Sequence, residues 1–241
     1  MEDLRNDEDL SEDLQMMVDP LSHRFQVAVG ARFLELVKIN KNMRDLIDYS
    51  FQVPRLRPPG PEEGTDHSWL LQMVERLRDW RDMLPHSLLM PAPERATGPS
   101  NNVPLHLSYY AYTALLFRAL MSPATAEARN DPSSNLCRWF GTAVAEFQAF
   151  TRFMDEITSE DLQGFWGRHA RSQLILCGNF IIYLFLQQPK SSDIQSAWSL
   201  VQTFRSSLHR LDSQAYDVAK LSIRPVFLRI ESFFSQGPEL I

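Results

Sequence analysis

The most continuously apolar stretch of the chain is residues 104–121, PLHLSYYAYTALLFRALM, where apolar or aromatic side chains surround almost the whole circumference of a helix. Its clearly polar side chains are His106, Ser108, Thr113 and Arg118. A helix that is apolar on nearly every side must be buried. A membrane span needs about 20 apolar residues, and this run is shorter and contains Arg118. The pattern therefore predicts the central core helix of a soluble domain rather than a membrane span.

Amphipathic spacing at intervals of three and four residues predicts further helices on both sides of this segment. We expect them at residues 22–51, 66–84, 135–157, 159–186 and from 192 onward, where Pro225 is expected to cause a break or kink near Arg224 before a final turn. In the first of these helices Ser22 is the expected N-cap, and the face expected in the core carries Phe25, Val29, Phe33, Leu36, Met43 and Ile47. In the helix from 192, the inward residues are expected to be Ile194, Trp198, Val201, Phe204, Leu208 and Leu211.

The loops between these helices are marked by proline. Eleven of the 15 prolines fall in residues 52–66, 85–104 and 123–134, and few lie within the helical patterns. There is no alternating strand pattern and no repeat of fixed period. The sequence therefore predicts an all-α fold: a single irregular domain of about six or seven helices, residues 21–241, preceded by an acidic mobile arm, residues 1–20.

The charge is unevenly distributed, and this bears on the class of partner. The net charge is -6, but residues 1–19 contain eight acids and one base, so residues 20–241 sum to +1. Such a body lacks the basic surface of a nucleic-acid binder. Composition leaves the arm open to two interpretations, a solvated acidic segment or a transcriptional activation segment.

Sequence motifs for catalysis or metal binding are absent. The chain has no Gly-rich phosphate loop and no G-x-S-x-G or H-E-x-x-H motif. The two cysteines, Cys137 and Cys177, are too few for a zinc cluster or a disulfide framework, and the six histidines are dispersed without metal-ligand spacing. We therefore expect no metal, no cofactor and no catalytic residues.

Candidate binding residues lie on the central helix. His106 and Arg118 stand on the segment expected to be most buried, where an unpaired charge is costly. One interpretation is a helix-end histidine and a buried arginine paired with a carboxylate, and the other is a polar contact in a ligand pocket. If a pocket exists, buried tyrosine hydroxyls and a buried guanidinium need partners. This predicts Tyr109, Tyr112 and Arg118 as its ligand-binding residues.

Four segments in order along the chain resemble the regulatory, or middle homology, region of fungal Zn2Cys6 binuclear-cluster transcription factors. The first is residues 32–38, RFLELVK, and the second is Leu77-Arg78-Asp79-Trp80 followed by Leu84-Pro85, similar to an L-x-x-W-x-x-x-L-P signature. The third is the L-H-L-x-Y run, residues 105–118. The fourth runs from residue 197 to Phe234 and resembles the cutinase and fatty-acid-responsive subgroup.

The resemblance spans residues 20–236 and implies a function. It implies a non-enzymatic regulatory domain in the nucleus that modulates transcription through a small-molecule effector, a protein partner or a homodimer. Two departures stand out: Ala119 replaces the usual proline, and the six cysteines of the zinc cluster are absent. The chain is then expected to be a regulatory domain that has lost its DNA-binding module and does not itself bind DNA specifically. The alternatives are an all-α enzyme and a helical scaffold.

Overall fold

The structure is a computed structural model that describes residues 29–51, 67–90, 102–158, 161–163, 168–215 and 217–236. Its α-helices are α2 (Val29–Phe51), α3 (His67–Asp82), α4 (Val103–Leu120), α5 (Ala126–Asn130), α6 (Asn135–Glu156), α7 (Arg168–Leu186), α8 (Ser191–Gln214) and α9 (Asp217–Gln236). Two 3-10 turns, η4 (His86–Leu88) and η6 (Asp161–Gln163), complete the regular structure of this part of the chain, which contains no strand. The prediction of an all-α helical domain is confirmed.

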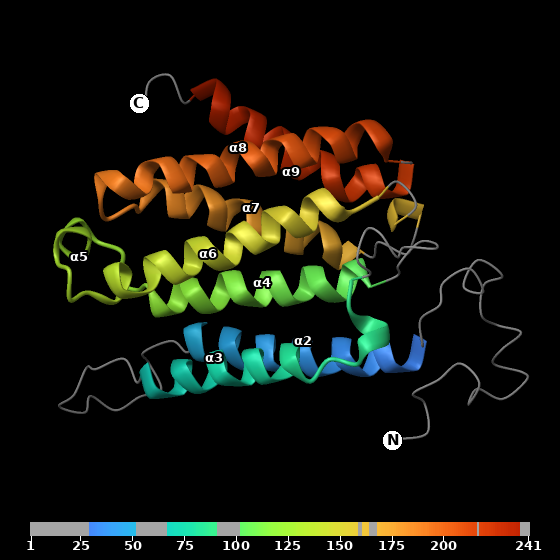
Figure 1. The fold of residues 1–241 in the computed structure, drawn as a ribbon, viewed down its shortest axis with the longest axis horizontal. Helices are drawn as coiled ribbons and strands as arrows, with labels where there is room; N and C mark the ends of the chain where they lie inside the picture. Colours follow the sequence, from blue (N-terminus) through green and yellow to red (C-terminus); the bar gives the residue numbers. More distant parts are fainter. Residues whose placement is uncertain are drawn as a thin grey trace, which may run out of the picture.

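The helix α4 occupies the centre of the molecule, as the sequence predicts. It packs against α2, α3, α6 and α7, and Leu105, Leu107, Tyr112, Leu116 and Leu120 are all fully or almost fully buried. In Figure 1, α2 and α3 lie along one edge, α4 and α6 across the middle, and α8 along the opposite edge. Helices α2 and α3 thus cover one side of α4, which has almost no polar side of its own, and α6 and α7 cover the other.

The remaining core is built largely from α6, α7, α8 and α9. The helix expected at residues 135–157 is α6, and its regularly spaced apolar side chains are all buried: Leu136, Phe140, Val144, Phe147, Phe150 and Met154. Ser134 caps this helix by accepting a hydrogen bond from the Cys137 amide. In α7, Gly178 permits close packing, because a Cβ at that position would lie 3.1 Å from Phe204 Cε1 and 3.3 Å from Val226 Cγ1.

The prediction for the buried face of α2 is wrong for Phe33 and Ile47 but right for Leu36 and Met43, which are half-buried and pack against the core. The side chains of Phe33 and Ile47 are 64% and 39% exposed, and the buried ones are Ala31, Ile39 and Leu46. Both sets repeat at helical intervals, so α2 is apolar on two faces. The face with Ile39 and Leu46 is the one that packs on the body of the protein. Ser22 and Phe25 lie outside the described residues, as does the arm at residues 1–20.

Three smaller predictions also need correction. Ile194 is 42% exposed rather than inward. The expected helix at 159–186 is instead the turn η6 and then α7, which begins at Arg168. No break occurs near Arg224, because α9 continues as a helix through Pro225. The carbonyl that loses its donor belongs to Leu221, which is 70% exposed, so water can replace the missing hydrogen bond.

Helix α6 ends against a side chain from α8. The Arg210 guanidinium donates hydrogen bonds to the carbonyls of Met154, Asp155 and Ile157 at 2.8, 3.0 and 2.8 Å. The last carbonyls of a helix have no partner within the helix, and a cation near them also interacts favourably with the helix dipole. Arg210 therefore fixes the end of α6 to α8.

We predict that Arg210→Ala lowers the free energy of unfolding by about 1 to 3 kcal/mol, because it leaves these carbonyls without their charged donor. Arg210→Lys should recover part of the loss, since an ammonium group still reaches one or two of them. Urea denaturation measures the change. Arg224→Ala, at an exposed position of α9, is the control and should cost less than about 0.5 kcal/mol. Equal costs for the two alanine variants would contradict this role of Arg210.

Candidate functional site

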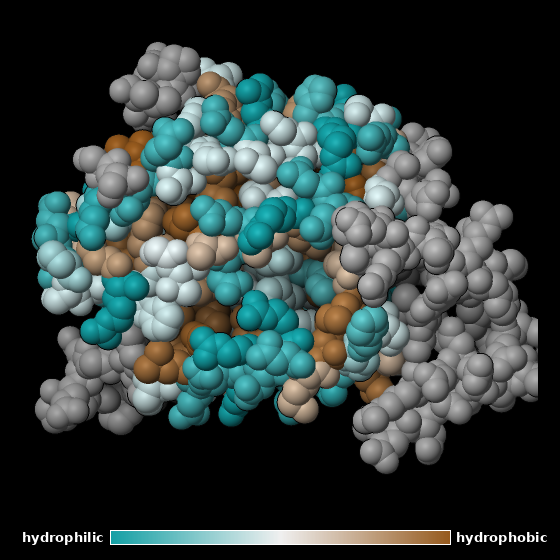
Figure 2. Space-filling view, in the orientation of Figure 1, coloured by the Kyte–Doolittle hydropathy of each residue, from teal (hydrophilic) through white to brown (hydrophobic). Residues whose placement is uncertain are grey.

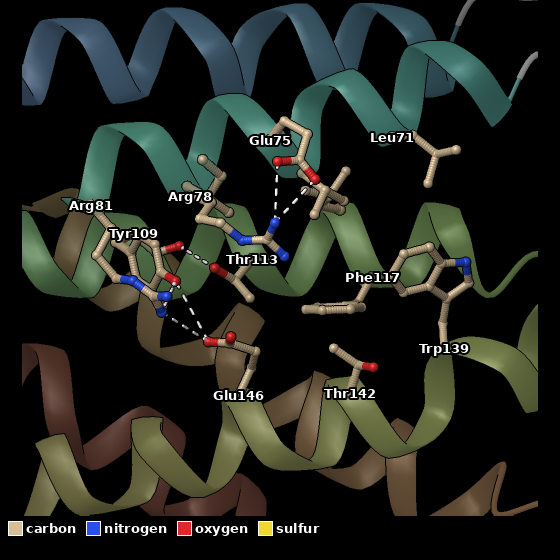
Figure 3. A pocket seen from close by; sticks show the side chains of 13 residues that line it. Leu71, Glu75, Arg78, Arg81, Tyr109, Thr113, Phe117, Trp139, Thr142 and Glu146 are labelled. Carbon is tan, nitrogen blue, oxygen red and sulfur yellow. Dashed lines mark hydrogen bonds and ion pairs between the residues drawn. The ribbon is translucent and has the colours of Figure 1, made fainter. Parts of the chain in front are cut away.

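A groove lies over α4 between α3 and α6. Both outer helices pack against α4 but make little direct contact with each other, which leaves a hollow of about 130 Å³. Figure 3 shows its floor on α4 and its walls on the two outer helices. Its lining residues are Leu71, Val74, Glu75, Leu77, Arg78, Arg81, Tyr109, Thr113, Leu116, Phe117, Trp139, Thr142 and Glu146.

One end of the groove is closed by a polar bridge between its walls. Arg81 of α3 donates a hydrogen bond from Nη1 to the Tyr109 hydroxyl at 3.1 Å, and its Nη1 lies 3.7 Å from Oε2 of Glu146 on α6. The Tyr109 hydroxyl donates to the same Glu146 oxygen at 3.5 Å. Burial, and then the Glu146 charge, raise the pKa of Tyr109 to about 12 despite the opposing effect of Arg81. Tyr109 is therefore a neutral donor at physiological pH.

The other end of the groove is apolar. The rings of Phe117 and Trp139 lie with their centroids 6.2 Å apart, and Leu71 stands at the rim with 46% of its surface exposed. In the space-filling view (Figure 2), this face of the molecule is mixed, with apolar surface visible between hydrophilic side chains. An apolar group that enters at this end would contact aromatic rings on two different helices.

Arg78 lies between the two ends, as Figure 3 shows. Its Nη1 donates to both carboxylate oxygens of Glu75 at 3.1 Å, one turn away on the same helix. The two side chains are 56% and 61% exposed, and an exposed pair of this kind contributes little stability. The Arg78 guanidinium can therefore exchange Glu75 for a ligand group at little cost.

The structure does not bring the three predicted binding residues together. Tyr109 lines the groove, but Tyr112 is fully buried beside it and donates from its hydroxyl to Met73 Sδ at 3.2 Å. Arg118 is exposed on another side of α4, where its guanidinium lies 5.5 Å from the ring centroid of Tyr183. The interpretation of Arg118 as a buried arginine paired with a carboxylate is wrong.

The sequence did not point to Arg78, Arg81 or Glu146 as site residues. Each stands on the polar face of an amphipathic helix, where a charged residue is ordinary. Their convergence depends on how α3 and α6 are placed around α4. The sequence does contain a signal for the residues of the groove floor. Four of them share one face of α4, because they occur at intervals of four, three and one residues: Tyr109, Thr113, Leu116 and Phe117.

The chemistry of the groove favours binding of one small group. Its volume is close to that of an apolar cavity of about 150 Å³ that binds benzene. It is smaller than the roughly 300 Å³ or more of a pocket for a drug-sized ligand. Each of its two glutamates faces an arginine, and no histidine lines it. Among the described residues, no group of three or more His, Cys, Asp or Glu side chains is placed to hold a metal ion.

The two cysteines are free and do not belong to the groove. Burial raises the pKa of the Cys177 thiol, so this side chain behaves as a small apolar group in the core. No helix within the described ranges has both the length and the apolar character needed to cross a membrane. No known family model matches the sequence, and no solved structure matches the chain significantly.

We predict that Tyr109→Phe and Tyr112→Phe have different effects on stability. Tyr109→Phe removes a hydroxyl that bridges a guanidinium and a carboxylate, and should cost about 1 kcal/mol. Tyr112→Phe removes a bond to a thioether sulfur, which is a weak acceptor, and should cost close to zero. Equilibrium urea unfolding compares the two variants. A larger cost for Tyr112→Phe would mean that the polar bridge does not join the walls of the groove.

His106 provides a pH-dependent prediction. Its Nε2 lies 2.9 Å from the Leu88 carbonyl, to which it must donate. Burial lowers the pKa of His106, and this hydrogen bond opposes the shift. As the pH falls below about 6.5, the ordinary pKa of histidine, the unfolded chain therefore takes up the proton first. This contribution to stability is present above about pH 6.5 and is lost as the pH falls toward the lower pKa of the folded state.

The variant His106→Gln keeps an N–H donor but cannot be protonated. We predict that it loses less stability than the wild type between pH 7 and pH 5, as measured by urea denaturation at a series of pH values. Parallel curves for the two proteins would show that His106 does not contribute to acid sensitivity.

Proposed function

We propose that this chain is a non-enzymatic regulatory domain that acts in the nucleus and modulates transcription by binding an effector in the groove between α3 and α6. The observation that carries the proposal is the groove itself, with an apolar end and a polar end built over the buried helix α4. A largely apolar site with a few placed polar groups is typical of ligand recognition. Both glutamates of the groove are paired with an arginine. A catalytic site would instead be expected to present an unpaired acid or base.

The order of sequence motifs supports the transcriptional part of the proposal. Two of the four segments that resemble the fungal regulatory region contribute residues to the groove, whose third side is formed by α6. The L-x-x-W segment provides Leu77, Arg78 and the neighbouring Arg81, and the L-H-L-x-Y segment provides Tyr109 and Phe117. Trp80, the tryptophan of the L-x-x-W segment, stacks on Tyr109 with a centroid distance of 5.8 Å, and its Nε1 donates to Glu35 of α2 at 2.8 Å. The motif tryptophan thus connects the groove to two further helices.

The dimensions of the groove indicate the class of effector. It fits a ring-sized, largely apolar molecule with one hydrogen-bonding group. The apolar part would contact Phe117 and Trp139, and the polar group would reach Arg78 or the bridge of Arg81, Tyr109 and Glu146. Charges within the groove balance, with two arginines and two glutamates, so a strongly charged ligand gains no net attraction.

An effector in this position has a physical route to a regulatory output. The walls of the groove belong to helices whose mutual contact is limited, and the polar bridge is half-exposed, with 48% of the Arg81 side chain and 28% of the Glu146 side chain accessible. A molecule seated between the walls therefore favours one separation of α3 and α6 over another. Binding that differs between two states shifts their populations, and the surface presented to a transcriptional partner changes accordingly.

A reporter assay tests the function. The chain is fused to an unrelated DNA-binding domain, because we do not expect it to bind DNA specifically by itself, and transcription is compared with that of the DNA-binding domain alone. Thr142→Trp blocks the groove from an exposed position on α6, and Gln148→Trp places the same side chain at an exposed position on another face of that helix. We expect the first substitution to change reporter output several-fold and the second to leave it unchanged.

Two results would contradict the proposal. Output from the wild-type fusion equal to that of the DNA-binding domain alone would exclude a transcriptional effect, and equal output from the two tryptophan variants would exclude the groove. A second experiment examines binding alone: amide resonances of the purified chain are followed during titration with benzyl alcohol, a ring with one hydroxyl group. Shifts confined to α3, α4 and α6 in the wild type, and absent in Thr142→Trp, are the expected result.

A further inference from the structure

The outer face of α2 carries a regular stripe of side chains. Phe33, Val37, Asn40, Arg44 and Ile47 follow one another at intervals of four, three, four and three residues. At about 100° per residue, these five positions lie within an arc of roughly 80° on the helix surface. This alternation of three and four is the seven-residue spacing with which two helices pack along a common seam.

The stripe is exposed and lies opposite the face that packs on the body of the protein. The exposed fractions are 64% for Phe33, 50% for Val37 and 39% for Ile47, and the Arg44 side chain is 83% exposed. The buried residues Ile39 and Leu46 lie on the other side of the helix. Three large apolar side chains thus lie along one exposed helix face over roughly 21 Å, with two polar side chains between them.

We propose that this stripe is a self-association surface, on which α2 packs antiparallel against α2 of a second copy of the chain about a two-fold axis near residue 42. The reason is that the stripe is complementary to itself when its direction is reversed. Val37 of one protomer then lies opposite Ile47 of its partner, and Asn40 lies opposite Arg44. A two-fold interface requires such a match, since each contact occurs twice with the roles exchanged.

The polar pair at the centre of the stripe selects this orientation. The Asn40 side-chain amide donates to the Leu36 carbonyl at 2.7 Å, and no described residue is seen to donate to its Oδ1. Arg44 forms an exposed ion pair with Asp48 through Nε at 3.7 Å, which is weak. In the antiparallel arrangement the guanidinium of the partner's Arg44 faces the Asn40 oxygen and can donate to it. In a parallel arrangement the two Arg44 guanidinium groups would lie side by side and repel. Polar residues within a seam are a known means of fixing register and direction.

The energetics indicate a weak, reversible dimer. The described part of the seam covers about two heptads, fewer than the three or four that identify an isolated coiled coil. However, α2 is already held as a helix by its packing on α4, so association does not need to cover the cost of forming the helix. The contact is smaller than the roughly 800 Å² per partner of a standard interface. We therefore expect a dissociation constant on the order of 10 to 100 μM.

Sedimentation velocity over a concentration series tests the proposal on the full chain. We expect a monomer at low concentration and a dimer that accumulates above the stated dissociation constant. Val37→Lys should abolish the dimer, because it places a charge in the apolar part of the seam. Leu221→Lys changes an equally apolar residue that is 70% exposed on α9 and should leave association unchanged. Thermal unfolding followed by circular dichroism confirms that each variant is folded.

A charge-exchange pair tests the direction of the helices. Asn40→Lys places an ammonium group opposite Arg44 of the partner, twice in each dimer, and should weaken association tenfold or more. Adding Arg44→Glu to this variant turns both contacts into attractions and should restore the dimer. In a parallel arrangement like charges would meet at both positions, so the double variant would not recover.

Each outcome decides the question. Monomeric wild type up to about 500 μM overturns the proposal, as does a dimer that neither Val37→Lys nor Asn40→Lys weakens. A dimer that Asn40→Lys weakens and the double variant does not restore overturns the antiparallel arrangement. Weakening by Val37→Lys and Asn40→Lys, together with restoration by the double variant and no effect of Leu221→Lys, supports it.

Discussion

The burial of α4 is the constraint on which the rest of the structure depends. This helix has almost no polar side, so it is stable in water only when other helices enclose it. The structure meets this requirement with α2 and α3 on one side and α6 and α7 on the other. Burial of a large aliphatic or aromatic side chain stabilises a protein by about 1.5 to 3 kcal/mol. The many such residues on α4 therefore make its enclosure a dominant contribution to folding.

The groove is a consequence of the same constraint. Helices α3 and α6 are positioned by their contacts with α4 rather than with each other, and two cylinders resting on a third leave a hollow between them. Charged side chains that extend from both walls partly close it, through Arg81 and Glu146. Because this bridge is half-exposed, it joins the walls without locking them. The site is thus a small space with an aromatic floor and an adjustable rim, suited to binding.

The two apolar faces of α2 have different roles. One face, with Ile39 and Leu46, is buried against the body of the protein, and its interaction is part of the fold. The other face interrupts its apolar side chains with Asn40 and Arg44, which keeps it compatible with solvent. A face of this kind suits the proposed interface, which forms and dissociates, because Asn40 and Arg44 already have partners within α2 when two copies are apart.

Local sequence pattern determined the fold class, the central place of α4 and the approximate positions of α2, α3, α6, α7 and α8, but not the separate helix α9. Helical periodicity, a fully apolar circumference and proline-rich boundaries can each be read within a single segment, without knowledge of what the segment contacts. The pattern also located Tyr109 on the helix that forms the floor of the groove.

Only the tertiary structure decided which face of α2 is buried, because two apolar stripes compete and the choice depends on the surface they meet. It also decided that Arg118 is exposed, since even a central helix reaches solvent along the line where its neighbours do not meet. The tertiary structure likewise decided that Arg78, Arg81 and Glu146 surround one groove. On separate amphipathic helices they look like solvated charges, and they converge only when packing on α4 sets the separation and rotation of those helices.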